Sequence, residues 1–175
     1  MATSFTLDLM CNMAKRDYLI GNSQDLHVLV RGRPLILGGV NIPYELGLLG
    51  HSDADVIYHV VSESILGALA LGDLGMHFSD RDPKNKDLDS ATIVSYAVRL
   101  MKTAGYEVNN IDISVSVEEP KLAKYILEMR TNIANLLEIN VQYVSVKATT
   151  NEKQDSVGRG ESIEARATVL LRSKE

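Results

Sequence analysis

The apolar residues of the chain recur with a helical period over three stretches. Over residues 53–70 they come every three or four positions, which predicts a helix with a buried side. A second helix is predicted to begin at a cap, Asp89 or Ser90, and to end at a glycine. A third is predicted over residues 121–138, directly after Pro120, because proline suits the start of a helix.

Elsewhere apolar and polar residues alternate, which is the period of a strand with one buried face. This alternation predicts strands over residues 111–118, 144–148 and 163–171. Two shorter apolar runs flank Gly38 and Gly39, and such a pair around a glycine turn predicts a hairpin.

Together these elements predict a single-domain α+β fold, a β/α sandwich in which helices cover one face of a mixed sheet. No linker, repeat or low-complexity tract interrupts the pattern, and 175 residues with 45% hydrophobic content suit one domain. We expect residues 1–17 to form an N-terminal extension and residues 18–173 to form the domain. Small side chains at Ala165 and Ala167 indicate that the last strand packs against another subunit, or lies at a sheet edge beside a helix.

Charge and composition exclude several classes of protein. A net charge of −5, with acidic and basic residues interspersed, argues against a nucleic-acid surface and against a basic membrane-binding helix. The apolar runs are too short to span a bilayer, and the first sixteen residues lack the apolar core of a secretory signal. Cys11 is the single cysteine, so a reducing compartment is expected. We expect a bacterial cytoplasm, or a plastid-like organelle if the source is eukaryotic.

The most informative local pattern is Asp25-Leu26-His27. On an extended strand, residues two apart project from the same face, so the carboxylate of Asp25 and the imidazole of His27 lie together. One further imidazole would complete a three-ligand site with an open fourth position, which is the catalytic arrangement for zinc. A single Asp-x-His pair is more often a surface or structural feature, and the evidence for metal is its clustering with other histidines.

Two histidines could supply the third ligand, His51 and His59. They are eight residues apart, which is about 12 Å along a helix axis, too far for both to bind one ion. His59 lies inside the first predicted helix and is the better ligand. His51 and Ser52 are expected at the N-terminus of that helix, where backbone N–H groups favour a phosphate. His77 is interpreted as a structural residue.

An ordered series of motifs resembles the 2-C-methyl-D-erythritol 2,4-cyclodiphosphate synthase family. The match runs nearly without gaps from about Tyr18 to Arg172, which makes it far more specific than any one motif. The motifs, with x for any residue, are Asp25-x-His27, Leu35-Ile36-Leu37-Gly38-Gly39-Val40-x-Ile42-Pro43, His51-Ser52-Asp53-x-Asp55-Val56-x-x-His59, Leu66-Gly67-Ala68, Gly72-Asp73-Leu74-Gly75, Phe78-x-Asp80-x-Asp82-Pro83, Pro120-Lys121 and Lys147-Ala148-Thr149-Thr150-x-Glu152-Lys153.

The resemblance implies a phosphorus–oxygen lyase of the non-mevalonate route to isoprenoids. It would convert 4-diphosphocytidyl-2-C-methyl-D-erythritol 2-phosphate to the 2,4-cyclodiphosphate and release CMP. It also implies a homotrimer whose active sites lie between neighbouring subunits. Zinc or another divalent ion would bind at Asp25, His27 and His59, and Glu152 would be the protein ligand of a second ion, Mg²⁺ or Mn²⁺.

The resemblance further implies roles for residues that composition alone would leave on the surface. His51 and Ser52 would meet the 2-phosphate, while Thr149 and Thr150 would donate hydroxyl groups to the diphosphate. The remaining substrate-binding residues would be Asp73, Gly75 and Asp80 around the methylerythritol, Pro120, Lys121, Leu122 and Ala123 around the cytidine, and Arg159 facing a phosphate.

Two stretches depart from the pattern of the resemblance. Residues 21–24 read Gly-Asn-Ser-Gln, where the family usually has a histidine, a glycine and an aromatic residue, so the surroundings of Asp25 are expected to differ. Residues 154–158 replace a common segment that contains an aromatic residue. Two other functions remain open at this point: a non-catalytic protein that binds metal and phosphoesters, and a zinc-dependent phosphohydrolase.

Overall fold

The structure is a computed structural model, and it describes residues 16–79, 85 and 88–174. The expected N-terminal extension therefore lies almost wholly outside the described residues, as do Cys11 and the predicted substrate-binding residue Asp80. No helix within the described ranges is both long enough and apolar enough to cross a membrane.

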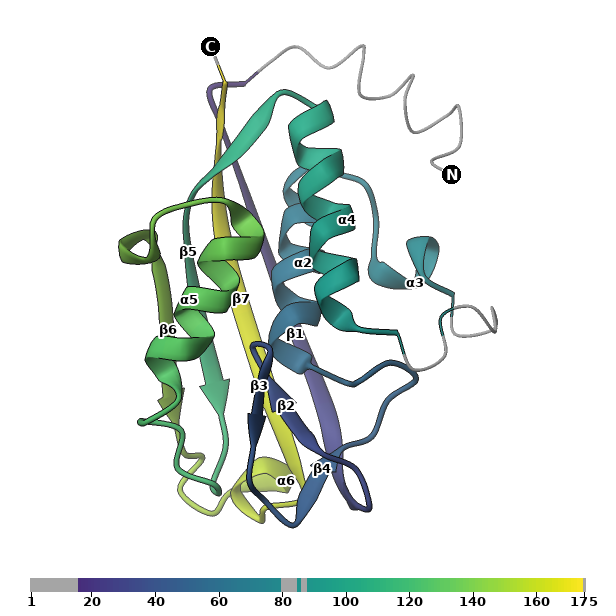
Figure 1. Ribbon diagram of the computed structural model, residues 1–175, viewed down its shortest axis with the longest axis vertical. Coiled ribbons are helices and arrows are strands. Elements are labelled where there is room, and N and C mark those ends of the chain that lie inside the picture. Colours follow the sequence, from purple (N-terminus) through teal and green to yellow (C-terminus); the bar gives the residue numbers. More distant parts are fainter. Residues whose placement is uncertain (1–15, 80–84, 86–87, 175) are drawn as a thin grey trace.

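The centre of the described fold is one mixed sheet of five strands in the order β4-β1-β7-β5-β6 (Figure 1). β5 and β6 run parallel, and each other neighbouring pair is antiparallel. This confirms the predicted mixed sheet and all three long alternating strands. The strands are β1 (Tyr18–Arg31), β4 (Leu46–Leu48), β5 (Tyr106–Ser116), β6 (Val144–Thr149) and β7 (Ser162–Ser173).

The predicted hairpin is also present, as β2 (Leu35–Leu37) and β3 (Val40–Ile42). Gly38 and Gly39 make its turn with φ angles of 57° and 73°. Glycine is required at the second position for a further reason, because a Cβ there would lie 2.3 Å from the hydroxyl oxygen of Tyr58.

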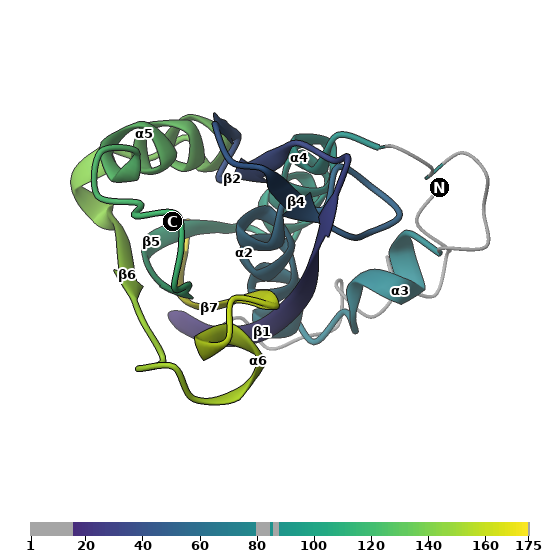
Figure 2. The same cartoon turned by 90° about the horizontal axis from the view of Figure 1, so that it is seen from below.

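Three helices cover one face of the sheet, as Figures 1 and 2 show. They are α2 (Val56–Ala68), α4 (Ser90–Thr103) and α5 (Ile126–Leu137), and Asp89 caps α4. Shorter helices are α3 (Leu74–His77), α6 (Asp155–Gly158) and the 3₁₀ helix η2 (Val141–Tyr143).

The third predicted helix begins later than expected, at Ile126 instead of residue 121. The intervening residues form a turn in which the backbone N–H of Tyr125 donates to the carbonyl of Leu122 at 2.8 Å. Leu122 is buried by this turn, with 2% of its surface exposed. Burial of one leucine in a turn after Pro120 therefore replaces the first helical turn that the sequence predicted.

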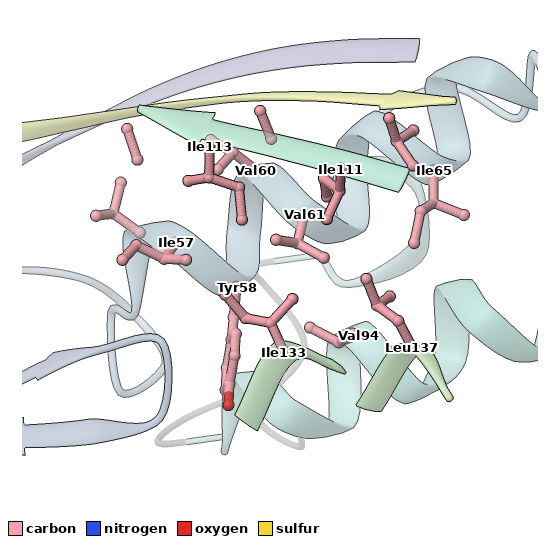
Figure 3. Close-up of a cluster of buried hydrophobic side chains, with 14 of the residues drawn as sticks. Ile57, Tyr58, Val60, Val61, Ile65, Val94, Ile111, Ile113, Ile133 and Leu137 are labelled. Carbon is pink, nitrogen blue, oxygen red and sulfur yellow. The ribbon is translucent and has the colours of Figure 1, made fainter. Parts of the chain in front are cut away.

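Helix α2 is the centre of the core of the described fold, because it is buried on nearly every side. Its apolar residues pack on the sheet on one side and on α4 on the other (Figure 3). A helix buried on both sides has a broad apolar surface rather than a single stripe. The labelled core residues are Ile57, Tyr58, Val60, Val61, Ile65, Val94, Ile111, Ile113, Ile133 and Leu137.

The small residues of the last strand have a role that neither interpretation of the sequence gave. β7 is the middle strand of the sheet, and Ala165 and Ala167 are 0% and 2% exposed within the chain. They belong to the same core cluster as the α2 residues. Their small size thus allows helix and sheet to approach closely. The expectation of a sheet edge was wrong, and contact of this strand with another subunit stays a prediction.

Candidate active site

A polar stripe on α2 faces a polar stripe on β1. The stripe on α2 holds His59 and Glu63, one helical turn apart, and the stripe on β1 holds Asp25 and Ser23. Four helical residues rise about 6 Å and two strand residues rise about 6.6 Å, so the two rows match in length. His59 Nδ1 lies 3.2 Å from Asp25 Oδ2, and the Ser23 hydroxyl donates to Glu63 at 2.5 Å.

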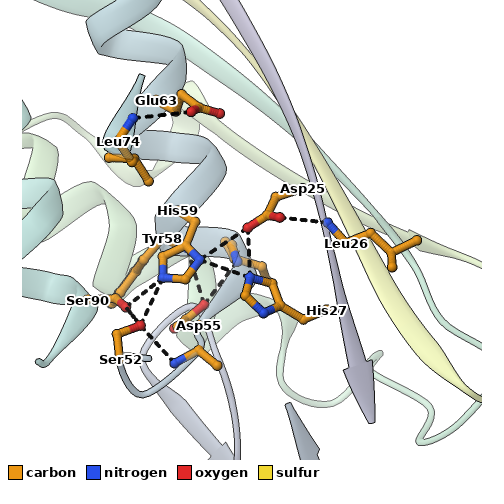
Figure 4. Close-up of polar contacts among 12 residues, drawn as sticks. Asp25, Leu26, His27, Ser52, Asp55, Tyr58, His59, Glu63, Leu74 and Ser90 are labelled. Carbon is orange, nitrogen blue, oxygen red and sulfur yellow. Dashed lines mark hydrogen bonds and ion pairs between the residues drawn. The ribbon is translucent and has the colours of Figure 1, made fainter. Parts of the chain in front are cut away.

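Asp25, His27 and His59 form a cluster that could hold a metal ion. His27 Nε2 lies 2.8 Å from Asp25 Oδ2, and His59 Nδ1 lies 3.2 Å from each of those atoms (Figure 4). A tetrahedral zinc ion with bonds of about 2.0 Å needs ligand atoms about 3.3 Å apart. The donor set therefore fits a divalent ion, and its mixture of two imidazoles and one carboxylate suits zinc.

Hydrogen bonds on the far side of each imidazole fix which nitrogen faces the cluster. His27 Nδ1 lies 2.7 Å from the carbonyl oxygen of Leu49, which can only accept, so Nδ1 carries the proton and Nε2 faces Asp25. His59 Nε2 lies 3.1 Å from the Ser52 hydroxyl and 3.2 Å from the Ser90 hydroxyl. In Figure 4 these hydroxyl groups and the other ligands lie on opposite sides of the His59 ring.

Contacts within the cluster also shift the pKa values of Asp25 and His27. Burial alone would raise the pKa of Asp25, but its interactions with the two imidazoles outweigh burial and hold that pKa well below its usual range. Burial would lower the pKa of His27, and its bonds to Asp25 and to Leu49 outweigh that effect and raise it. An anionic carboxylate is thus secured at the centre of the cluster.

The start of α2 differs from the anion site that the sequence predicted. Asp55 is the N-cap, and its buried carboxylate accepts from the backbone N–H groups of Ile57 and Tyr58. It also accepts from Gly38 at 2.9 Å and Gly39 at 2.7 Å, and burial raises its pKa to about 6 against these hydrogen bonds. The helix end is therefore occupied by the chain's own carboxylate, and the expectation that it receives a phosphate was wrong.

His51 and Ser52 lie in the loop before that cap. The Ser52 side chain is buried and turned toward His59, while His51 is exposed. The loop is held by the Arg33 guanidinium, whose Nη2 donates to the carbonyl of Ser52 at 2.6 Å. Ser52 thus borders the metal cluster without using the helix end.

A second group of predicted residues gathers at the end of β6. Pro120, Lys121, Leu122, Thr149 and Thr150 line a small cavity of about 150 Å³, together with Val117 and Ala148. Glu152 follows in the adjoining loop, where its carboxylate accepts from the Thr150 hydroxyl at 3.1 Å. Ala123 is exposed beside the cavity residues in sequence.

Glu118 joins the two segments of this second group, a role that the sequence analysis did not assign. Its Oε1 accepts from the backbone N–H groups of Asn151 and Lys153, both at 3.1 Å. Its carbonyl oxygen accepts from Lys121 Nζ at 3.0 Å. Glu118 therefore holds the loop of Glu152 against the turn of Lys121.

The two groups lie at the same level of the sheet but near opposite edges. Asp25 pairs with Ala165, Ala165 with Val115, and Val115 with Ala148. This row crosses three strand spacings, or about 14 Å. Within one chain the metal cluster and the Thr149–Glu152 segment are therefore separate, with the width of the sheet between them.

The remaining predicted residues lie at α3 and at the end of α6. Asp73 caps α3 by accepting from Met76 at 2.9 Å, and Gly75 lies exposed in that helix. The backbone N–H of Leu74 donates to Glu63, which ties α3 to the polar stripe of α2 (Figure 4). Arg159 is exposed and pairs with Glu161 at 2.8 Å.

His77 has the structural role that the sequence analysis gave it. Its Nδ1 lies 3.0 Å from the Tyr96 hydroxyl, and its Nε2 lies 2.9 Å from the carbonyl oxygen of Leu71. Both ring nitrogens are therefore engaged in holding α3 near α4.

Comparison with known proteins agrees with these features. The YgbB family model matches residues 18–172. The 2-C-methyl-D-erythritol 2,4-cyclodiphosphate synthase of Geobacillus kaustophilus is 54% identical over 154 residues, which make up 88% of this chain and 98% of that protein.

Solved structures are similar in fold as well as in sequence. The bifunctional IspDF from Campylobacter jejuni matches with a TM-score of 0.87 and 38% identity, covering 90% of this chain and 43% of that longer one. IspF from Plasmodium falciparum, in a CDP complex, matches with a TM-score of 0.81 and 37% identity, covering 93% and 100%. The chain therefore belongs to the YgbB family of 2-C-methyl-D-erythritol 2,4-cyclodiphosphate synthases, as the ordered motifs of its sequence predict.

Proposed function

We propose that the chain is an active enzyme that forms 2-C-methyl-D-erythritol 2,4-cyclodiphosphate and CMP from 4-diphosphocytidyl-2-C-methyl-D-erythritol 2-phosphate. The observation that carries this proposal is the Asp25, His27 and His59 cluster, whose donor geometry fits a divalent ion, in a chain of this family. Folding does not require two histidines and a carboxylate at such short mutual distances. A metal ion that assists phosphoryl transfer does need a set of close ligands.

The reaction transfers one phosphoryl group within the substrate. An oxygen of the 2-phosphate bonds to the β-phosphorus, the bond from that phosphorus to the bridging oxygen breaks, and the bridging oxygen leaves with CMP. The nucleophile is already anionic at neutral pH, so catalysis depends on positioning and charge neutralisation more than on a side-chain base.

The residues of the first group would hold the methylerythritol phosphate. His51 would donate to the 2-phosphate and Ser52 would border it, while Asp73, Gly75 and Asp80 would surround the methylerythritol. Zinc on Asp25, His27 and His59, and Mg²⁺ or Mn²⁺ on Glu152, would supply positive charge that polarises the phosphate oxygens.

The residues of the second group would hold the leaving nucleotide. Pro120, Lys121, Leu122 and Ala123 would receive the cytidine, and Thr149 and Thr150 would donate hydroxyl groups to the diphosphate. Arg159 would face a phosphate once its ion pair with Glu161 is broken. The Glu118 carboxylate accepts from the backbone N–H of Asn151 and so holds the loop that contains Glu152 in place.

We further propose that the active unit is a homotrimer with sites between subunits. The support is the separation of the two residue groups within one chain, because one cannot reach across the sheet to the other. A ring of copies with a head-to-tail interface would bring the metal cluster of one subunit to the nucleotide group of its neighbour. Sedimentation at micromolar concentration should give a trimer, and a fully active monomer would contradict this arrangement.

Product analysis tests the function directly. We expect phosphorus NMR of the protein incubated with the diphosphocytidyl substrate, zinc and Mg²⁺ to reveal the cyclic diphosphate and CMP. Linear phosphate products would indicate a zinc-dependent phosphohydrolase, and binding without turnover would indicate a non-catalytic protein. His59→Ala is the matched variant, since loss of one ligand of three should abolish both zinc retention and turnover.

A further inference from the structure

We infer that Asp53 and Ser90 act as positioning residues that fix the tautomer of His59 for metal binding. Ser90 is the first residue of α4, and Asp53 lies in the loop before α2. Neither residue is adjacent to His59 in the sequence. This inference rests on the proposed metal site and extends it to residues beyond the ligands.

The contacts form a continuous path from Asp53 to the metal cluster. The Ser90 hydroxyl donates to Asp53 Oδ1 at 2.5 Å, and the Ser90 backbone N–H donates to Asp53 Oδ2 at 3.1 Å. The same hydroxyl oxygen lies 3.2 Å from His59 Nε2. On the other side of the ring, His59 Nδ1 faces Asp25 and His27.

The direction of each hydrogen bond follows from the carboxylate at the end of the path. An ionised carboxylate can only accept, so the Ser90 hydroxyl donates its single proton to Asp53. Its oxygen is then an acceptor toward His59, and Nε2 must carry the proton of the imidazole. The lone pair of His59 is thereby left on Nδ1, the nitrogen that faces Asp25 and His27.

Ser52 supports the same tautomer without determining it. Its hydroxyl oxygen already accepts from the backbone N–H of Ala54 at 3.1 Å and lies 3.1 Å from His59 Nε2. A hydroxyl with no carboxylate behind it could either donate to Nε2 or accept from it. At Ser90 the Asp53 carboxylate fixes the direction of the hydroxyl. Asp53 therefore affects the tautomer of His59 without contacting its ring.

Zinc titration of the metal-free protein tests the inference, with Ser90→Ala as the test variant. Loss of a hydrogen-bond partner behind a histidine ligand typically costs 10-fold to 100-fold in metal affinity. We expect zinc binding to weaken by about 10-fold, near the lower limit, because Ser52 remains. Asp53→Asn should also weaken zinc binding, since its amide can donate to Ser90 and reverse the hydroxyl.

Ser62→Ala is the matched control. Ser62 is a fully buried serine of α2 whose hydroxyl donates to the carbonyl of Tyr58 at 2.7 Å. Its loss should lower thermal stability and leave zinc affinity unchanged. If Ser90→Ala binds zinc as tightly as Ser62→Ala does, the inference is overturned.

Nitrogen NMR of the unaltered, zinc-loaded protein gives a second test that needs no variant. It should place zinc on His59 Nδ1 and a proton on Nε2, and zinc on Nε2 would overturn the inference even if Ser90→Ala failed to fold. Absence of zinc binding by the unaltered protein is a different outcome, because it would remove the proposed metal site itself.

Discussion

Gly21 lies directly against helix α2, so close that a Cβ on it would be 2.0 Å from the carbonyl oxygen of Ser64. This contact sets the distance between β1 and α2, and the metal cluster depends on that distance. Two ligands, Asp25 and His27, come from the strand, and the third, His59, comes from the helix. The glycine thus belongs to the metal site through packing, although it contacts no ligand.

Gly21→Ala should therefore damage both stability and metal binding. The added methyl group meets backbone atoms that cannot move independently, so we expect a loss of about 3 kcal/mol or more in the free energy of unfolding. Zinc affinity should fall as α2 is displaced. Urea unfolding and zinc titration measure the two effects.

Gly67→Ala is the matched control for that change. Gly67 lies in α2 above the same strand, and the nearest atom to its added Cβ would be 3.9 Å away, the carbonyl oxygen of Asn22. Alanine in a helix is favoured over glycine by about 0.5–1 kcal/mol, so this variant should be more stable. Equal effects of the two substitutions would contradict the packing account.

The carboxylate of Asp55 joins the hairpin turn to α2. Asp55→Ala should cost about 3 kcal/mol, because it removes an N-cap worth about 1 kcal/mol and leaves the N–H groups of Gly38 and Gly39 without a partner. Asp89→Ala removes the exposed cap of α4 and should cost only about 1 kcal/mol. Urea unfolding compares the two, and a loss for Asp55→Ala no larger than that for Asp89→Ala would be against this role.

The ion pair of Asp25 and His27 predicts a pH dependence for the metal-free protein. The pKa of His27 is raised above 6.5, so its contribution to stability is present below that pH and is lost as the pH rises through the folded value. The pKa of Asp25 is lowered from 3.8, so its contribution is lost as the pH falls through its folded value. The stabilising contributions of both residues should therefore be fully present between about pH 3.8 and pH 6.5.

His27→Gln provides the reference for this pH dependence. The difference in unfolding free energy between the unaltered protein and His27→Gln, both without metal, should be larger at about pH 5.5 than at about pH 9. A difference that is constant or grows with pH would show that His27 is not held protonated by Asp25.

Glu152 and His51 lie in different residue groups, and their variants should respond differently to added metal. Glu152→Gln should lower kcat strongly and be partly restored by high Mg²⁺ or Mn²⁺, with normal zinc content, if Glu152 is the proposed ligand of the second ion. His51→Ala should lose about 10²–10³-fold in kcat with no rescue, if His51 is the proposed donor to the 2-phosphate.

Steady-state rates and zinc content across a Mg²⁺ titration measure these responses. Glu45→Gln is a suitable control, because Glu45 is an exposed carboxylate that pairs with Arg31. Identical responses of the Glu152 and His51 variants would contradict the division of roles.

Much of the fold could be predicted because the apolar residues recur with regular helical and strand periods. The alternation of Ile111, Ile113 and Val115 with polar residues gave a strand whose apolar side is buried. Helix length excluded a site that used both His51 and His59, and the place of His59 inside the predicted helix favoured it as the ligand. Local spacing determined these features, and tertiary packing did not override it.

Other features depend on contacts that spacing does not encode. The late start of α5 comes from burial of Leu122, and the link between the α2 N-cap and the hairpin turn comes from Asp55 accepting from Gly38. Ser90, Glu118 and the Leu49 carbonyl meet the site only through long-range folding. Ser90 had one weak signal, its position at a predicted helix start, and a backbone carbonyl has none.

In the proposed reaction the phosphoryl group is transferred within the substrate and not to water. Turnover in water enriched in oxygen-18, followed by mass spectrometry of both products, distinguishes these two routes. Intramolecular attack predicts that neither CMP nor the cyclic diphosphate gains a heavy oxygen, because every oxygen in both products comes from the substrate. Heavy oxygen incorporated into either product during turnover would contradict the account and identify the reaction as hydrolysis.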